Sequence, residues 1–198
     1  MLLYDNPISG NCYKVRLLLA HLGIACERKT IAVGDRSKRG NVLEGLNPAH
    51  RIPTLVLDDG RPIAESNAIL WYLGDGTRYV PDDRYERAQV LQWLFFEQYE
   101  HEPNVAVARY WLRYRDAPVD REALAARRAG GHRALAAMEA HLSGRSWLAG
   151  DRYSIADISL YAYTHVAHEG EIELAAYPAI LAWLGRVAEQ PGHVTIDA

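Results

Sequence analysis

The stretch from residue 52 to residue 74, IPTLVLDDGRPIAESNAILWYLG, decides how the first part of this chain folds. Its first six residues form a mainly apolar run that predicts a buried strand. Asp59-Gly60 is typical of a two-residue hairpin turn, because both residue types tolerate positive φ. Pro62-Ile63-Ala64 then returns as the antiparallel partner. Ser66 is expected to cap an apolar helix that Gly74 ends.

A strand, a helix and a second strand are expected before this hairpin. Residues 1–4 form a short apolar run, and apolar residues then recur with helical spacing from Val15 to Leu22. Gly23 is placed to end that helix. Residues 25–32 predict a more polar strand, and residues 34–50 are expected to be a surface segment. The predicted fold class of this part is therefore α/β, in the order βαβ followed by ββα.

The composition changes after residue 75, and this change predicts a second domain. Residues 76–84 contain Gly and Pro punctuation typical of a linker, and residues 85–198 show no strand pattern. We expect an all-α helical bundle there, with residues 1–75 as the first domain. Ser154 and Asp157 are spaced as a capping box. The expected helices cover approximately residues 84–115, 120–142, 154–168 and 178–190. Gly130-Gly131 interrupts the second of these for no reason that the sequence shows.

Charge and composition exclude several classes of function. The chain has 198 residues with 22 Lys+Arg and 25 Asp+Glu, which gives a net charge of −3. Nucleic-acid binders usually carry a basic surplus, so no nucleic-acid partner is expected. No apolar run reaches the ~20 residues that cross a bilayer, and no signal peptide is visible, which predicts a cytoplasmic protein without a membrane partner. Cys12 and Cys26 are too few for a disulfide framework, and no metal site is expected.

Ser9-Gly10-Asn11-Cys12 lies between the first predicted strand and the first predicted helix. A helix N-terminus exposes unpaired N–H groups and carries partial positive charge, so it stabilises an anion such as a thiolate. A Ser9 hydroxyl there can donate a further hydrogen bond. The alternative is that Ser9 or Asn11 only caps the helix, which is the commoner role of these residue types.

Two further motifs could bind the main chain and the α-amino-acid group of a peptide-like ligand that carries such a thiolate. If the Ile52–Pro53 bond is cis, the Ile52 main chain turns outward and can pair with an extended ligand, although most X-Pro bonds are trans. Glu65 and Ser66 suit the ammonium and carboxylate of an α-amino acid, although they also suit an ordinary helix start. A thiolate site, a main-chain site and an amino-acid site, in this order, match the parts of glutathione.

Four segments carry a resemblance to a known family: residues 9–16, 47–55, 63–69 and 154–157. With these segments in this order and spacing, the sequence resembles a cytosolic glutathione transferase over nearly its whole length. The resemblance implies a thioredoxin-like first domain with a cis bond before Pro53 and an all-α second domain. It also implies a symmetric homodimer and a role in detoxification. Glutathione would be the co-substrate, without any other cofactor, and the second substrate would be a small apolar electrophile.

The resemblance also implies site residues. Ser9 would support the glutathione thiolate as the catalytic residue. The glutathione-binding set would be Ser9, Asn11, His50, Arg51, Ile52, Pro53, Glu65 and Ser66, with His50 and Arg51 as alternatives for the glycyl carboxylate. The electrophile pocket would include Asn104, Tyr110 and Trp111. Tyr4, at the end of the first strand, is expected to be structural.

Two other functions fit the same fold. Ser9-Gly10-Asn11-Cys12 matches a C-x-x-C box with serine in the first position, so Cys12 could act in glutathione-dependent disulfide reduction. Cys12 falls one helical turn inward, however, where a thiol is buried, and a structural role is favoured. The third possibility is a transferase-like scaffold that binds ligands without catalysis.

Overall fold

The computed structural model describes residues 1–32 and 39–198, and its internal contacts divide the chain into two compact units. The first unit contains Met1–Asp75 together with Pro191–Ala198, and the second contains Gly76–Gln190. The beginning of the expected surface segment at 34–50 lies outside the described residues. Each unit is described below by itself.

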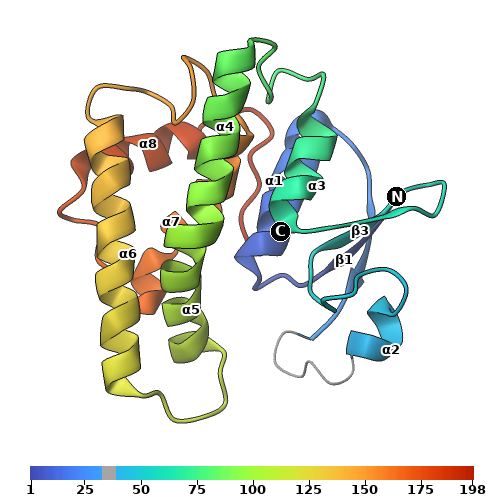
Figure 1. Cartoon of the computed structure of the whole chain (residues 1–198), viewed down its shortest axis with the longest axis horizontal. Helices are drawn as coiled ribbons and strands as arrows, with labels where there is room; N and C mark the ends of the chain where they lie inside the picture. The colour runs from blue at the N-terminus through green and yellow to red at the C-terminus, as the bar shows by residue number, and fades with distance from the viewer. Residues whose placement is uncertain (33–38) are drawn as a thin grey trace. The chain divides into compact units, whose positions relative to one another are not determined.

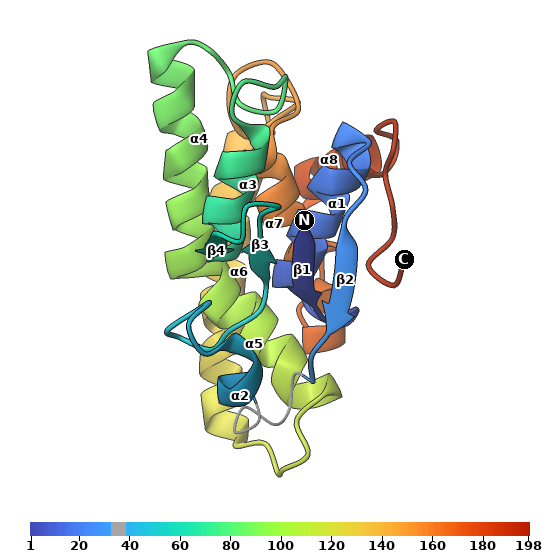
Figure 2. The same cartoon turned by 90° about the vertical axis from the view of Figure 1, so that its right-hand side faces the viewer.

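The first unit is built on a four-stranded sheet with the order β2-β1-β3-β4 (Figures 1 and 2). The strands are β1 (Leu2–Asp5), β2 (Glu27–Thr30), β3 (Thr54–Val56) and β4 (Pro62–Ala64). The helices are α1 (Gly10–Leu22), α2 (Gly40–Leu43) and α3 (Ser66–Gly74). β1 and β2 are parallel because α1 forms the crossover between them, whereas β1–β3 and β3–β4 are antiparallel. This is the thioredoxin-like order that the sequence predicts.

Alternation along the strands gives the sheet two apolar faces. Leu3 and Leu55 point to one face, where they pack with Val15 and Leu19 of α1 and Ile69 of α3. Tyr4 points to the other face, in a cluster with Ile31 and Leu43. Figure 1 shows α1 and α3 together on one side of the sheet and α2 on the other. Most residues of α1 are therefore buried. This packing against the sheet fixes the position of the first turn of α1, which follows the end of β1.

The segment Pro191–Ala198 lies against α1 and β2 (Figure 2). Four of its main-chain oxygens accept hydrogen bonds from side chains of the first unit: Pro191 from His21, Val194 from Tyr13, Ile196 from Arg16 and Ala198 from Arg28. We expected residues 85–198 to form the helical domain throughout. The last eight residues instead join the first unit, because donors on α1 and β2 pair with their carbonyl groups.

The second unit is helical. It contains α4 (Arg84–Phe96), the π-helix η2 (Glu97–His101), α5 (Glu102–Arg113), α6 (Arg121–Leu142), α7 (Ile155–Thr164), the 3-10 helix η3 (Ala167–Gly170) and α8 (Pro178–Ala188). The helix expected over residues 84–115 is thus interrupted by a π-helical turn. Pro103, in the first turn of α5, has no N–H to donate to the preceding turn, which favours this change of pitch. No helix within the described residues is both long and apolar enough to cross a membrane.

The capping box predicted at the start of α7 is present. Ser154 accepts a hydrogen bond from Ala156 N–H, and the Ser154 N–H donates to Asp157 at 2.9 Å. The same carboxylate accepts from Leu148 N–H at 3.0 Å and from the Trp183 indole at 2.9 Å. Burial raises the pKa of Asp157 to about 6, so the group is mainly ionised at neutral pH. It therefore joins α7 to α8 and to the preceding loop.

Gly130 and Gly131 have a packing role that the sequence did not reveal. A Cβ atom on Gly130 would lie 2.2 Å from Oδ1 of Asn104 on α5, and one on Gly131 would lie 2.7 Å from Cδ1 of Ile172. Neither distance is compatible with a side chain unless the neighbour moves. The two glycines therefore allow α5 and the segment after η3 to approach α6 closely.

Two other glycines provide a matched test of packing in the second unit. A Cβ on Gly170 would lie 2.9 Å from the main-chain nitrogen of Arg109, which cannot move without α5, whereas nothing lies within 4 Å of a Cβ on Gly185 in α8. We expect Gly170→Ala to lower the free energy of unfolding by about 1–3 kcal/mol. Gly185→Ala should raise it by about 0.5–1 kcal/mol, because alanine favours the helix. Urea denaturation measures both, and a Gly170→Ala variant as stable as wild type would contradict this account.

Candidate functional site

Strand pairing brings the three predicted motifs to one edge of the sheet. Tyr4 of β1 pairs with Thr54 of β3, and Thr54 pairs with Ala64 of β4, in both cases antiparallel. The end of β1, the start of β3 and the end of β4 therefore lie at the same edge. The segments that continue from these three ends are Asn6–Asn11, Ile52–Pro53 and Glu65–Ser66.

Ser9 is the N-cap of α1. Its main chain is extended, and its Oγ accepts a hydrogen bond from the Cys12 N–H at 3.3 Å. The capping role considered for Ser9 is thus observed. A hydroxyl that accepts a bond through a lone pair still has its own proton to donate. Because the first turn of α1 contains no acidic residue, the partial positive charge of this helix end is not neutralised within the turn.

The loop that carries Ser9 is held from both sides. The Asn6 amide donates to the Ile31 carbonyl at 2.7 Å and accepts from Ile8 N–H at 3.1 Å. The buried Arg16 donates to the Asn6 carbonyl at 3.2 Å and to the Pro7 carbonyl at 3.1 Å. Neither Asn6 nor Arg16 was predicted as a site residue. Both hold the loop that carries the Ser9 hydroxyl.

The Ile52–Pro53 bond is cis, as the resemblance implied. The ladder of β3 begins at Thr54, so Ile52 lies just before the paired part of the strand. The buried Asn47 amide donates to the Arg51 carbonyl at 2.9 Å and to the Thr54 hydroxyl at 3.0 Å, which holds this turn. The main chain of Ile52 is therefore placed at the sheet edge, where an extended ligand can pair with it.

His50 and Arg51 lie beside this turn. His50 has a φ of 50°, in the left-handed region, and its ring is half-buried next to Gly40. Arg51 is exposed. Both residues lie at the same edge of the sheet as Ile52. Their contact with the glycyl carboxylate of glutathione stays a prediction.

Glu65 and Ser66 begin α3 in an arrangement that the sequence did not predict. Ser66 is the first residue of the helix rather than its cap, and its hydroxyl accepts from the Lys14 ammonium and donates to the Asn11 amide oxygen, both at 3.3 Å. Glu65 precedes it with a φ of 67°. A non-glycine residue in this region stores strain of about 1–3 kcal/mol, and such residues concentrate at functional sites. The starts of α1 and α3 are thereby linked.

Lys14 contacts the candidate site, and the sequence reasoning did not single it out. Its side chain is fully buried in α1, and its ammonium group contacts Ser66. An ammonium, a hydroxyl and the first-turn N–H groups of α3 together provide donors for a carboxylate. The exposed carboxylate of Glu65 is next to them and suits a ligand ammonium group. The available signal was a charged residue placed between Tyr13 and Val15, both of which are buried in α1.

Comparison with known proteins matches the two parts of this chain to the two domains of one family. Residues 8–75 match the N-terminal domain of glutathione S-transferases, and residues 91–191 match their C-terminal domain. This chain belongs to the glutathione S-transferase family. A solved glutathione S-transferase from Pseudomonas fluorescens is 45% identical, with a TM-score of 0.94 and 98% of each chain covered.

Two curated relatives of this chain carry names for different reactions. Glutathione S-transferase D7 of Anopheles gambiae is 31% identical over 96% of this chain and 88% of its own length. The disulfide-bond oxidoreductase YfcG of Escherichia coli is 29% identical over 96% of this chain and 90% of its own length. Family membership therefore does not select one reaction of the glutathione thiol.

Within this transferase fold, Cys12 is a core residue. Its side chain has no exposed surface, and burial, with a smaller contribution from Asp5, raises the pKa of its thiol to about 12. A buried, protonated thiol is inert. The alternative in which Cys12 acts as a redox thiol does not fit this environment. Tyr4 is also buried and packs with Ile31 and Leu43, in agreement with a structural role.

The residues predicted for the electrophile pocket all lie on α5. Asn104 packs against Gly130 and donates to the Glu100 carbonyl at 2.6 Å. Trp111 is half-buried, and the guanidinium groups of Arg115 and Arg127 each lie 5.9 Å from its ring. Tyr110 is also half-buried. Their predicted role toward a second substrate stays a prediction.

Alkylation tests the burial of Cys12. Burial also raises the pKa of the Cys26 thiol, so the reaction is run at about pH 9. In native protein we expect iodoacetamide to modify Cys26, which is half-buried, and to leave Cys12 intact. Cys12 should react once the protein is unfolded in urea. Mass spectrometry of the digested protein measures both sites, and the Cys26→Ser variant should take up no label when native. Modification of native Cys12 at the rate of Cys26 would contradict its burial.

Proposed function

We propose that this protein is a glutathione transferase that activates the glutathione thiol for attack on a small apolar electrophile. The observation that carries the proposal is the Ser9 hydroxyl at the N-terminus of α1, in a first turn without an acidic residue. There a thiolate would receive a hydrogen bond from the hydroxyl and would lie in the positive field of the helix end. Glutathione is the co-substrate, and no other cofactor is required.

The remaining residues of the edge suit the two ends of the tripeptide. The Ser66 hydroxyl, which the buried Lys14 ammonium orients, would hold the γ-glutamyl carboxylate, and Glu65 would hold the adjacent ammonium. The main-chain groups of Ile52 would pair with the cysteinyl unit, as a neighbouring strand would. His50 or Arg51 would contact the glycyl carboxylate, and Asn11 would contact the peptide from the first turn of α1.

The Ser9 hydroxyl and the N-terminus of α1 can supply the free energy that is needed to lower the pKa of the glutathione thiol. A thiol has a pKa of about 8.5, and lowering it by about 2 units requires about 2.7 kcal/mol. One hydrogen bond from a hydroxyl to an anion supplies about 1.5–3 kcal/mol, and a helix end adds about 0.3–1 kcal/mol. The thiolate would then form a carbon–sulfur bond with the electrophile, for which Asn104, Tyr110 and Trp111 are the proposed contacts.

Disulfide reduction by bound glutathione is a second candidate, favoured by the name of the E. coli relative. The same thiolate would attack one sulfur of a disulfide, form a mixed disulfide and release the other sulfur as a thiolate. This reaction needs no protein cysteine, so the burial of Cys12 does not oppose it. A panel of haloarenes, isothiocyanates, epoxides, peroxides and a small disulfide, each assayed with glutathione, separates the two reactions.

Ser9→Ala tests the proposed activation. Loss of the hydroxyl should raise the pKa of the bound thiol by about 1–2 units, because the hydrogen bond to the anion is lost. At a pH below the wild-type pKa the turnover number should fall about tenfold or more, while the KM for glutathione changes much less. The ultraviolet absorbance of the thiolate, followed over pH, measures the shift.

Ser9→Thr is the control for this variant, because it keeps a hydroxyl that can cap the helix. We expect it to retain a pH–rate profile close to that of wild type. An unchanged profile in Ser9→Ala would exclude Ser9 as the activating group. Calorimetry that shows no binding of glutathione to the wild type would overturn the proposal as a whole, and binding without turnover on any member of the panel would favour the scaffold.

We also propose that the protein is a symmetric homodimer in the cytoplasm. Three aromatic residues in and next to α4 are strongly exposed: Tyr85 (70%), Phe95 (69%) and Tyr99 (83%). α6 exposes a row of alanines, namely Ala125, Ala126, Ala129, Ala136, Ala137 and Ala140. In a dimer with a two-fold axis, the large side chains of α4 in each subunit would pack against the alanines of α6 in the other subunit.

Negative charge in place of the exposed aromatic residues Phe95 and Tyr99 should break the proposed contact between subunits. The double variant Phe95→Glu/Tyr99→Glu is expected to behave as a monomer, because carboxylates would be buried at the interface without partners. Leu181→Glu on α8, another exposed apolar position, should stay dimeric. Size-exclusion chromatography with light scattering measures both masses. A monomeric wild type would contradict the proposed dimer.

A further inference from the structure

Two side chains of α1 connect the segment Pro191–Ala198 to the loop that carries Ser9. They are Tyr13 and Arg16, which lie on the same side of α1 because they are three residues apart. Both side chains are buried. The segment therefore reaches the candidate site through two buried contacts, although none of its own residues belongs to the predicted glutathione-binding set.

The guanidinium of Arg16 bridges the loop and the segment. Its Nη2 donates to the Pro7 carbonyl at 3.1 Å and also to the Ile196 carbonyl. Its Nη1 donates to Asp5 at 2.6 Å and to the Asn6 carbonyl at 3.2 Å. Each Nη carries two hydrogens, so these four bonds use all of them. If the segment withdrew, one acceptor would be lost, and water in its place would weaken the ion pair because it screens the charges.

Tyr13 connects the segment to the first turn of α1. Its hydroxyl donates to the Val194 carbonyl at 2.7 Å, which is the usual length of a strong hydroxyl hydrogen bond. Its N–H donates to the Ser9 carbonyl at 2.9 Å. Ser9 is the N-cap, and its Oγ accepts from the Cys12 N–H. A displacement of Tyr13 is therefore passed to the N-cap within about one helical turn.

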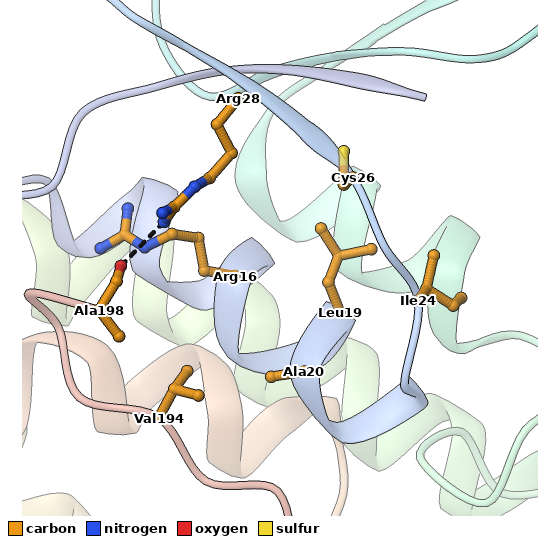
Figure 3. A pocket seen from close by; sticks show the side chains of 8 residues that line it. All are labelled: Arg16, Leu19, Ala20, Ile24, Cys26, Arg28, Val194 and Ala198. Atoms are coloured by element: carbon orange, nitrogen blue, oxygen red, sulfur yellow. Dashed lines mark hydrogen bonds between the residues drawn. The ribbon is translucent and has the colours of Figure 1, made fainter.

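The segment is also fitted to α1 where it begins. Gly192 has a φ of 79°, which glycine adopts without strain, and a Cβ there would lie 3.3 Å from the Ala20 carbonyl oxygen. Figure 3 shows the segment beside α1, where Val194 and Ala20 line the same small cavity. The Arg28 side chain holds its other end through the Ala198 carbonyl. Contacts to the first unit thus run along the whole segment.

We propose that the segment Pro191–Ala198 is a positioning element for Ser9: its carbonyl groups hold Tyr13 and Arg16, which in turn hold the N-cap and the loop before it. This inference rests on the proposed function, in which the Ser9 hydroxyl activates a thiol. The Asn6 amide holds the same loop from its other side, at the Ile31 carbonyl, so loss of the segment would loosen the loop without releasing it.

Two full-length variants weaken the connection. Tyr13→Phe removes the hydroxyl that donates to the Val194 carbonyl and keeps the aromatic ring in the core. Gly192→Val places a β-branched side chain at a left-handed φ and against the Ala20 carbonyl, so the segment should lose its fit to α1.

His21→Phe is the matched control. Like Tyr13→Phe, it removes one hydrogen bond to the segment, here to the Pro191 carbonyl, and keeps an aromatic ring. His21 lies in the last turn of α1, at the opposite end of the helix from Ser9. Its loss should therefore leave the N-cap unchanged.

Hydrogen exchange of the Cys12 amide, without glutathione, reports the position of Ser9 because this N–H donates to the Ser9 hydroxyl. Exchange should be about three- to tenfold faster in Tyr13→Phe and Gly192→Val, because a hydrogen bond or the fit that supports the turn is lost, and less than twofold faster in His21→Phe. The ¹H–¹⁵N heteronuclear NOE of Val194 measures how far each variant loosens the segment. Wild-type exchange at Cys12 in a variant with a loosened segment would overturn the proposal.

The pH profile of bound glutathione provides a second measurement, which a general loss of stability would not move. In Gly192→Val the pKa of the bound thiol should rise, so turnover at a pH below the wild-type pKa should fall about two- to tenfold, while the KM for glutathione changes less than twofold. In a Ser9→Ala background, Gly192→Val should cause no further rise, because the hydroxyl through which the segment acts is absent. An equal rise in both backgrounds would overturn the proposal.

The two measurements separate this proposal from the proposed function. If the wild type binds no glutathione, the transferase activity is refuted, whereas faster exchange at Cys12 in Tyr13→Phe still shows that the segment positions Ser9. If glutathione is activated but Cys12 exchanges equally in Tyr13→Phe, Gly192→Val and His21→Phe, the transferase proposal stands and the role of the segment is refuted.

Discussion

The buried guanidinium of Arg16 is the interaction on which the candidate site depends. Arg16 pairs with Asp5 at 2.6 Å, at the end of β1, and donates to the carbonyls of Asn6, Pro7 and Ile196. Removal of one partner of a buried ion pair leaves a charge that costs about 3–5 kcal/mol. The loop between β1 and α1, which carries Ser9, is therefore held by this side chain together with Asn6. The C-terminal segment is held by the same group.

A second constraint follows from the direction of the strands. Antiparallel pairing of β3 with both β1 and β4 makes three chain segments meet at one edge, so residues far apart in sequence lie close together there. The strained main chain of Glu65 is tolerated there because Ser66 is held between Lys14 and Asn11. The starts of α1 and α3 and the ends of these strands thus form one arrangement, joined by the bonds from Lys14 to Ser66 and from Ser66 to Asn11.

Local signals made much of this fold predictable. The Ser154–Asp157 capping box acts over four residues, and the structure contains it. The hairpin at Asp59-Gly60 is also present, but Leu57 pairs with Arg61, so its loop has three residues instead of two and only Gly60 has a positive φ. The docking of residues 191–198 was not predictable, because main-chain carbonyls accept its hydrogen bonds and carry no residue-specific signal. Lys14 was hidden because α1 is buried on nearly all sides, so helical periodicity did not separate an inner face from an outer one. The Ser66 hydroxyl was assigned to a cap because its partners, Lys14 and Asn11, lie more than fifty positions away.

The position of Cys12 explains how a thioredoxin-like fold can serve a thiol that is not its own. A thiol at an exposed helix N-terminus is stabilised as a thiolate by the N–H groups of the first turn. In this chain the cysteine nearest that position points into the core, where burial raises its pKa, and the outward position belongs to Ser9. The favourable field of the helix end is therefore not used by the protein's own sulfur. It is available to the sulfur of a ligand, and the cis turn at Ile52–Pro53 and the start of α3 at the same sheet edge would orient that ligand.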